Sequence, residues 1–92
     1  MKNKLAELQA MIQGTIAAYP DKSKRTKALK AIQWRLRGSN GEFVGLSKNL
    51  ACSFVPESDA MMFDGRDNET MKLSTYESAL GSLSIEILPQ AR

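Results

Sequence analysis

The spacing of apolar residues in this 92-residue chain changes near its middle. In the first part they recur every three or four positions, as at Leu5, Leu8 and Ile12, and this spacing predicts an amphipathic helix over residues 3–18. Later, short apolar runs lie between turn-forming residues, and residues 84–88 alternate between polar and apolar side chains as a half-buried strand does. The sequence therefore predicts the α+β class: an N-terminal two-helix hairpin followed by a small, mainly antiparallel sheet with one short helix.

Proline and glycine mark the expected ends of the two helices. The first helix should stop before Pro20, because the residue that precedes a proline disfavours helical dihedral angles. Asp21 or Ser23 can cap a second helix that runs to Arg37. Gly38 supplies the left-handed residue that commonly follows a helix. The apolar residues expected on the buried side of this second helix are Ala28, Leu29, Ile32 and Leu36.

Turn signals divide the rest of the chain into short elements. The expected strands are residues 42–46, 50–55, 60–63, 70–73 and 84–88. The polar turn at residues 64–69 should join the third and fourth of these strands as a hairpin. Ser74 and Glu77 have the spacing of a capping box. We therefore expect a short helix over residues 75–80 that ends at Gly81.

The residue types exclude several kinds of active site. The chain has no histidine and one cysteine, Cys52, so Ser-His-Asp and Cys-His catalysis, histidine-ligated metals and cysteine zinc sites are all excluded. Catalysis would have to rest on carboxylates, lysines, Tyr19 or Tyr76. The acidic segments also lack the spacing of an EF-hand calcium loop. We therefore expect a protein that is not an enzyme and that takes no metal or cofactor.

The length and the N-terminal sequence bear on domain organisation and location. Ninety-two residues allow one small domain, residues 1–92, with one modest core. The basic N-terminus is followed by a stretch that Glu7, Gln9 and Gln13 interrupt, so it lacks the unbroken apolar run of a secretory signal or a membrane span. The sequence predicts a cytoplasmic protein with no membrane partner.

Charge is distributed unevenly along the chain, although its net value is only +3. Residues 1–46 contain nine Lys and Arg and three acids, a net charge of +6, whereas residues 47–92 contain four bases and seven acids, a net charge of −3. The expected arrangement is a basic helical hairpin over residues 1–38 and an acidic, strand-rich part over residues 42–88. Such asymmetry suggests a charged partner.

A basic stripe is the main candidate binding surface. If the second helix runs to Arg37, then Lys27, Lys30 and Trp34 lie along one line of it, with Trp34 pointing away from the core. Phosphate backbones attract such a surface through counterion release, and an aromatic ring among cations can stack on an unpaired base. The candidate nucleic-acid or partner contacts are Lys22, Lys24, Arg25, Lys27, Lys30, Trp34, Arg35 and Arg37.

The same residues allow other interpretations. The charges can form a solvated face, and Trp34 can pack under the second half of the chain or make a cation–π contact with Lys30 or Arg37. A small DNA-binding regulator of the helix-turn-helix kind is a further alternative. However, Gln33 is the only amide in the expected second helix, whose lysines and arginines suit contact with the DNA backbone better than base readout.

The acidic part of the chain offers a second possible partner surface. Its candidate residues are Asp59, Asp64, Arg66, Asp67 and Glu69. The neighbouring run Met61-Met62-Phe63 can leave one apolar side chain exposed as an interface anchor. These features favour the alternative hypothesis of a protein–protein interaction module that binds a basic groove on another protein.

The basic segment also supports a family resemblance. It reads Tyr19-Pro20-Asp21-Lys22-Ser23-Lys24-Arg25-Thr26-Lys27 and is followed by Trp34, Arg35 and Arg37. With the small size, the uneven charge and the lack of enzyme motifs, this segment resembles the small phage-encoded anti-CRISPR proteins. The resemblance implies an inhibitor in the cytoplasm of a bacterial host. Such an inhibitor would dock on a Cas protein–guide RNA complex and block target DNA binding or nuclease recruitment, with the basic stripe on guide RNA or in a phosphate channel.

Overall fold

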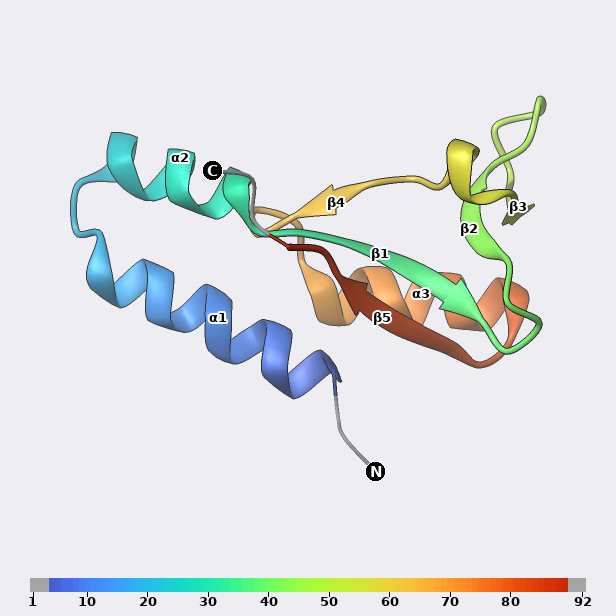
Figure 1. Cartoon of the computed structure of the whole chain (residues 1–92), viewed down its shortest axis with the longest axis horizontal. Helices are drawn as coiled ribbons and strands as arrows, with labels where there is room; N and C mark the ends of the chain where they lie inside the picture. The colour runs from blue at the N-terminus through green and yellow to red at the C-terminus, as the bar shows by residue number, and fades with distance from the viewer. Residues whose placement is uncertain (1–3, 90–92) are drawn as a thin grey trace.

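The computed structural model describes residues 4–89 and has three α-helices and a mainly antiparallel five-stranded sheet (Figure 1). In chain order the elements are α1 (Lys4–Ala18), α2 (Lys22–Ala31), β1 (Gln33–Gly38), β2 (Phe43–Leu46), β3 (Cys52–Val55), the 3-10 helix η1 (Glu57–Asp59), β4 (Phe63–Asp64), α3 (Glu69–Leu80) and β5 (Leu83–Ile87). Two helices precede the sheet, so the predicted α+β class is confirmed. Residue 3, where the first helix was expected to begin, lies outside the described residues.

Strand β1 is the centre of the sheet. Trp34 pairs with Phe63 of β4 and with Ile87 of β5, so these two strands lie on opposite edges of β1. Further along β1, Arg37 pairs with Phe43 of β2. β2 therefore follows β4 along one edge of β1 while β5 occupies the other edge, and β3 pairs with the outer edge of β2. All of these pairings are antiparallel.

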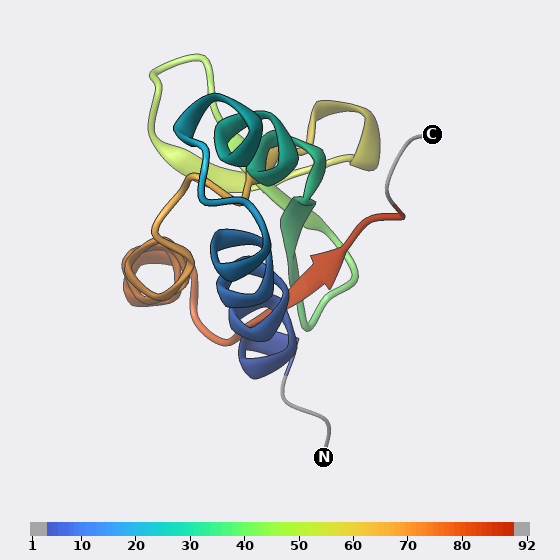
Figure 2. The same cartoon turned by 90° about the vertical axis from the view of Figure 1, so that its left-hand side faces the viewer.

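The two faces of the sheet differ in chemistry because side chains alternate along a strand. Trp34 and Leu36 of β1 point to the face that α1 and α3 cover, and Figure 2 shows these two helices on the same side of β1 and β5. The buried cluster on this side consists of Leu8, Ile12, Ile32, Trp34, Leu36, Val44, Phe63 and Ile85. Arg35 and Arg37 point to the other side. We call this side the polar face of the sheet, and it consists of Arg35, Arg37 and their pairing partners on β5, Glu86 and Ser84.

The predicted extent of the second helix is wrong. α2 ends at Ala31, and the backbone of Ile32 is extended, so residues 33–38 form β1 instead of continuing the helix for the nearly two further turns that were expected. As a strand, this segment buries Trp34 and pairs along both edges, which a helix could not do. Gly38 is therefore not a left-handed helix terminus. It is a strand residue at which a Cβ atom would collide with the ring of Phe54.

The predicted hairpin around residues 64–69 is also wrong. Only Phe63 and Asp64 form a strand there, and α3 begins at Glu69. Asn68 caps α3, because its side chain accepts a hydrogen bond from the Met71 backbone at 3.1 Å. The helix predicted over residues 75–80 therefore starts six residues earlier, but its predicted end is confirmed at Gly81, where φ is 91°. The strands predicted at residues 42–46, 50–55 and 84–88 correspond to β2, β3 and β5.

Candidate functional site

Helix α2 carries a group of cations that form no ion pair with the other described residues. Lys22, Lys24, Lys27 and Lys30 are exposed, and no ion pair found among residues 4–89 includes any of them. Arg25 is half-buried and its Nη1 donates to the carbonyl of Pro20 at 3.5 Å. The helix itself contains no Asp or Glu. We call these five residues, Lys22, Lys24, Arg25, Lys27 and Lys30, the α2 basic surface.

The position of α2 leaves this surface accessible. None of its residues is fully buried, and it contacts mainly α1 (Figure 1). Its C-terminal end is held to the sheet by the carbonyl of Leu29, which accepts a hydrogen bond from Gly65 at 2.9 Å. Its N-terminal end is capped by Asp21, whose carboxylate accepts from the Lys24 backbone at 3.0 Å. The predicted cap is thus confirmed, and it fixes the first turn of the helix that carries the lysines.

A shallow, mostly apolar depression of about 320 Å³ lies on the same helix. It is lined by Tyr19, Lys24, Lys27, Ala28 and Ala31. The four α2 residues follow the spacing i, i+3, i+4 and i+7, so they share one helix face. Tyr19 lies just beyond the end of α1 and is 42% exposed. The next residue, Pro20, ends the helical path of the chain at this point.

Trp34 is not part of the basic surface. Its side chain is 0% exposed and stacks on Phe63, with the ring centroids 4.5 Å apart. The indole Nε1 donates to the carbonyl of Asp64 at 3.2 Å. The expectation that Trp34 points away from the core is therefore wrong, because residues 33–38 form a strand whose even-numbered side chains face the helices. The alternative interpretation, that Trp34 packs under the second half of the chain, is confirmed.

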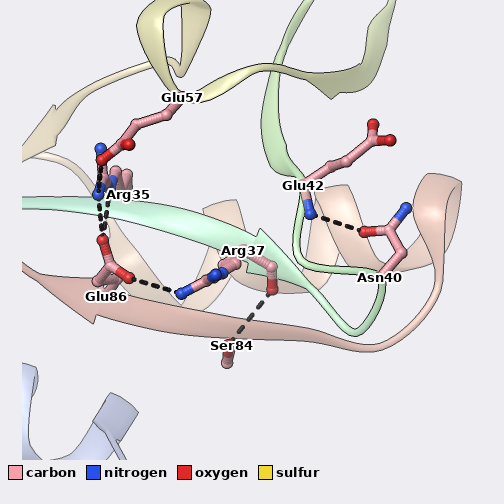
Figure 3. A network of polar contacts seen from close by, with 7 residues as sticks. All are labelled: Arg35, Arg37, Asn40, Glu42, Glu57, Ser84 and Glu86. Carbon is pink, nitrogen blue, oxygen red and sulfur yellow. Dashed lines mark hydrogen bonds and ion pairs between the residues drawn. The ribbon is translucent and has the colours of Figure 1, made fainter.

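Arg35 lies on the polar face of the sheet between two carboxylates (Figure 3). Its Nη2 lies 2.8 Å from Glu57 Oε2, and its Nε donates to Glu86 Oε1 at 2.6 Å. Burial lowers the pKa of Arg35, but the hydrogen bonds to Glu57 and Glu86 and the negative charges of these two residues together outweigh burial and leave that pKa above its ordinary value. The side chain is only 13% exposed and its charge is already compensated. Arg35 is thus held in the fold and is separate from the α2 basic surface.

Arg37 belongs to the same network but is less constrained. Its Nη1 lies 3.5 Å from Glu86 Oε2, and 48% of its side chain is exposed. The guanidinium carbon atoms of Arg35 and Arg37 lie 4.2 and 5.3 Å from the ring centroid of Phe43. These are the cation–π contacts that the structure describes here, and their ring is Phe43 instead of Trp34, for which a contact with Lys30 or Arg37 was one alternative interpretation. The eight predicted contact residues therefore separate into three places: α2, the core and the polar face.

The acidic residues do not form one surface either. Asp64 and Arg66 pair within a turn, with Nη2 and Oδ2 2.8 Å apart, and Asp67 accepts a hydrogen bond from the Asp64 backbone at 2.9 Å. The hydrogen bond from Arg66 holds the pKa of Asp64 below its ordinary value, against a smaller opposing effect of burial. Glu69 lies nearby in the first turn of α3. Asp59 is separate, because it belongs to η1, which lies beside β2 at the other end of β1.

The apolar run next to this turn is mostly internal. Phe63 is part of the core, Met61 is half-buried, and Met62 is 46% exposed. Tyr76 donates a hydrogen bond to the sulfur of Met61 at 3.9 Å, which ties this residue to α3. The expected interface anchor is thus reduced to the single side chain of Met62.

Residues 4–89 show neither a metal-binding cluster nor a membrane-spanning helix. In that part of the chain, no group of three or more Asp, Glu, Cys or His residues is placed to hold a metal ion. Its helices are also too short or too polar to cross a membrane. Comparison with known proteins adds no relative: no protein-family model, no curated protein and no solved structure matches this chain.

Proposed function

We propose that this protein is a non-enzymatic binding protein that docks the α2 basic surface on the phosphate backbone of a nucleic acid or nucleoprotein. The observation that carries the proposal is the set of exposed α2 lysines that form no ion pair within residues 4–89, on a helix without acids. A phosphate that replaces the counterions around such lysines releases those ions into solution, and this release favours binding. No carboxylate of the described residues has to be displaced first.

The polar face of the sheet contributes less to this proposal. Arg35 would have to give up hydrogen bonds to both Glu57 and Glu86 to reach a phosphate. Such an exchange gains little, because two compensating charges are lost for one new contact. The expected contact set therefore contracts to the α2 basic surface.

The most concrete form of the proposal is the one that the sequence resemblance implies. A small inhibitor of this kind would place α2 against the guide RNA of a Cas protein–guide RNA complex. The guide RNA presents a phosphate backbone, which is the chemistry that the α2 lysines fit, whereas the channel that receives target DNA is itself positively charged and would repel them. Excluding target DNA by occupancy requires no catalytic residue.

Salt-dependent binding tests the general proposal. Affinity for fluorescently labelled oligonucleotides should fall linearly on a log–log plot against salt concentration. Lys27→Glu and Lys30→Glu should each weaken binding and reduce that slope by about one. Lys48→Glu is the matched control, since it makes the same charge change at an exposed position in the loop between β2 and β3. Unchanged affinity in the two α2 variants, with folding confirmed by circular dichroism, would show that the lysines form only a solvated face.

A second experiment tests the inhibitor. Purified Cas protein–guide RNA complex is mixed with labelled target DNA, with and without the protein. The wild type and Lys48→Glu should reduce the fraction of bound target, whereas the double variant Lys27→Glu/Lys30→Glu should not. If the protein binds oligonucleotides but leaves target binding unchanged in complexes of several types, the inhibitor form is wrong and the general proposal stands.

A further inference from the structure

We propose that the depression on α2 receives an unpaired nucleobase against the ring of Tyr19, so that the ligand is a single-stranded rather than a double-stranded nucleic acid. This inference rests on the proposed function and specifies its substrate class. It uses a residue that the sequence did not single out as a nucleic-acid contact, at a place where an aromatic ring, small side chains and cations meet.

The size and the lining of the depression are compatible with a planar apolar group. Its volume of about 320 Å³ is at the lower end of the range found for small-molecule sites, which starts at about 300 Å³. Ala28 and Ala31 form part of its lining, and their short side chains leave space above the helix that longer residues would fill. Tyr19 lines this space and is 42% exposed, so its ring is available for stacking on a base.

The charges around the depression fit the rest of a nucleotide. Lys24 and Lys27 line it together with Tyr19, and neither lysine has an ion-pair partner among the described residues. One turn of helix separates the two lysines, so their Cβ atoms are about 5–6 Å apart on the same face. A base that lies on Tyr19 would therefore bring the phosphates on either side of it toward two cations. An apolar ligand without an anionic group would not use these cations.

The same geometry disfavours a duplex. In a double helix the bases are paired and stacked on one another, so a protein side chain beside the backbone meets no free base face. The lysines alone would then account for binding, and the Tyr19 ring would contribute nothing. In a single strand every base offers such a face, which is why aromatic rings among cations are typical of proteins that bind single strands. Because Trp34 is buried, Tyr19 is the aromatic residue that lines this part of the basic surface.

Oligonucleotide binding to a matched set of variants tests the inference. The ligands are single-stranded DNA, single-stranded RNA and duplex DNA of equal length, together with an abasic single strand that keeps the phosphates. The wild type should bind both ordinary single strands more tightly than the duplex or the abasic strand. Tyr19→Ala should lose about 5- to 150-fold in affinity for ordinary single strands, the loss expected for one base stack, and should change little with the duplex or the abasic strand.

Two controls separate stacking from structural effects. Tyr19→Phe keeps the ring and should retain the affinity of the wild type. Ile16→Ala removes a similarly exposed apolar side chain of α1 that does not line the depression, and it should also leave binding unchanged. A higher affinity for single-stranded RNA than for single-stranded DNA, or the reverse, would show which of the two nucleic acids is the ligand.

The outcomes distinguish this inference from the proposed function. If Lys27→Glu weakens binding but Tyr19→Ala has no effect, or weakens duplex and single-strand binding equally, the stacking site is wrong and the phosphate contact stands. Equal affinity of the wild type for the ordinary and the abasic single strand would likewise overturn the stacking site. If none of the oligonucleotides binds at low salt, both proposals fail.

Discussion

The indole ring of Trp34 stacks on the phenyl ring of Phe63, with the centroids 4.5 Å apart and the ring planes inclined by 23°. These residues are direct partners across β1 and β4. Phe63 also contacts Tyr76 of α3, at a centroid distance of 5.8 Å. Three aromatic rings thus connect the central strand, a strand of only two residues and the last helix. β4 has little backbone pairing of its own, so this stack is a main reason for its position.

Truncation of Trp34 should therefore be strongly destabilising. Trp34→Ala removes a fully buried ring and leaves the carbonyl of Asp64 without its indole donor, and we expect a loss of about 3–5 kcal/mol in the free energy of unfolding. Trp34→Phe keeps a ring on Phe63 and should lose less. Urea denaturation followed by circular dichroism measures both values. Met62→Ala is the control on an exposed neighbour, and a loss at Trp34 no larger than at Met62 would contradict the structure.

The sequence predicted the number of helices at the N-terminus but not where the second one ends. The segment Gln-Trp-Arg-Leu-Arg fits two periods at once, since Leu36 continues the stripe of Leu29 and Ile32 on a helix, while Trp34 and Leu36 share one face of a strand. Local pattern cannot decide between them. Pairing decides, because β5 and β4 supply partners for Trp34 that lie far away along the chain.

The polar face allows a comparison of two ion pairs that share one carboxylate. Arg35 is largely buried against Glu86, whereas Arg37 is half exposed and 3.5 Å from the same residue. A double-mutant cycle with Arg35→Met and Glu86→Gln should give a coupling of about 1 kcal/mol or more in unfolding free energy. The cycle with Arg37→Met and Glu86→Gln should give less than about 0.5 kcal/mol, since exposed pairs contribute little.

Repeating both double-mutant cycles at high salt tests whether the two coupling energies differ because of burial. Exposed charges are screened more strongly than buried ones, so added salt should remove the Arg37 coupling first. Equal couplings for Arg35 and Arg37 at low salt would mean that the difference in their burial has no energetic consequence.

The turn between β4 and α3 should make stability depend on acid pH. The hydrogen bond from Arg66, and to a smaller extent its charge, holds the pKa of Asp64 below the ordinary value of 3.8, which applies to the unfolded chain. A carboxyl group with a lowered folded-state pKa stabilises the fold above its unfolded pKa, and that contribution is lost as the pH falls through the folded pKa. The wild type should therefore be more stable than Asp64→Asn at pH 7, and the difference should shrink as the pH falls below about 4.

Arg66→Gln tests whether the guanidinium of Arg66 causes the lowered pKa of Asp64, because this variant keeps the carboxyl group. Without the guanidinium, the pKa of Asp64 should return toward its ordinary value, and the acid dependence of unfolding should flatten as in Asp64→Asn. Thermal unfolding between pH 7 and pH 2 measures all three proteins. Parallel curves for the wild type and both variants would show that the charge of Asp64 contributes nothing to the pH dependence of stability, which would contradict this prediction.

The candidate site was only partly visible in the sequence, for a related reason. The five cations of the α2 basic surface all lie within residues 22–31, so any helix over this segment brings them together. Their common surface could therefore be predicted from the sequence. The separation of Arg35 could not, because its partners Glu57 and Glu86 lie 22 and 51 residues away. The depression beside Tyr19 depends on how α1 turns into α2, and no spacing rule within one helix contains that information.

The cap of α2 gives a last prediction that connects stability to binding. Asp21→Ala should cost about 1 kcal/mol, because the Lys24 backbone loses its acceptor and α2 has no fully buried residue to compensate. Asp21→Asn keeps an oxygen acceptor at the same position and should restore most of the loss. Amide hydrogen exchange should therefore be faster in the first turn of α2 for Asp21→Ala than for the wild type or Asp21→Asn. Equal exchange rates in Asp21→Ala and Asp21→Asn would contradict the role of the cap.

The same two variants connect the cap to binding, because both remove the acid nearest to the α2 lysines along the chain. A gain in oligonucleotide affinity shared by the two variants would reflect charge. A loss of affinity confined to Asp21→Ala would show that binding requires the intact helix.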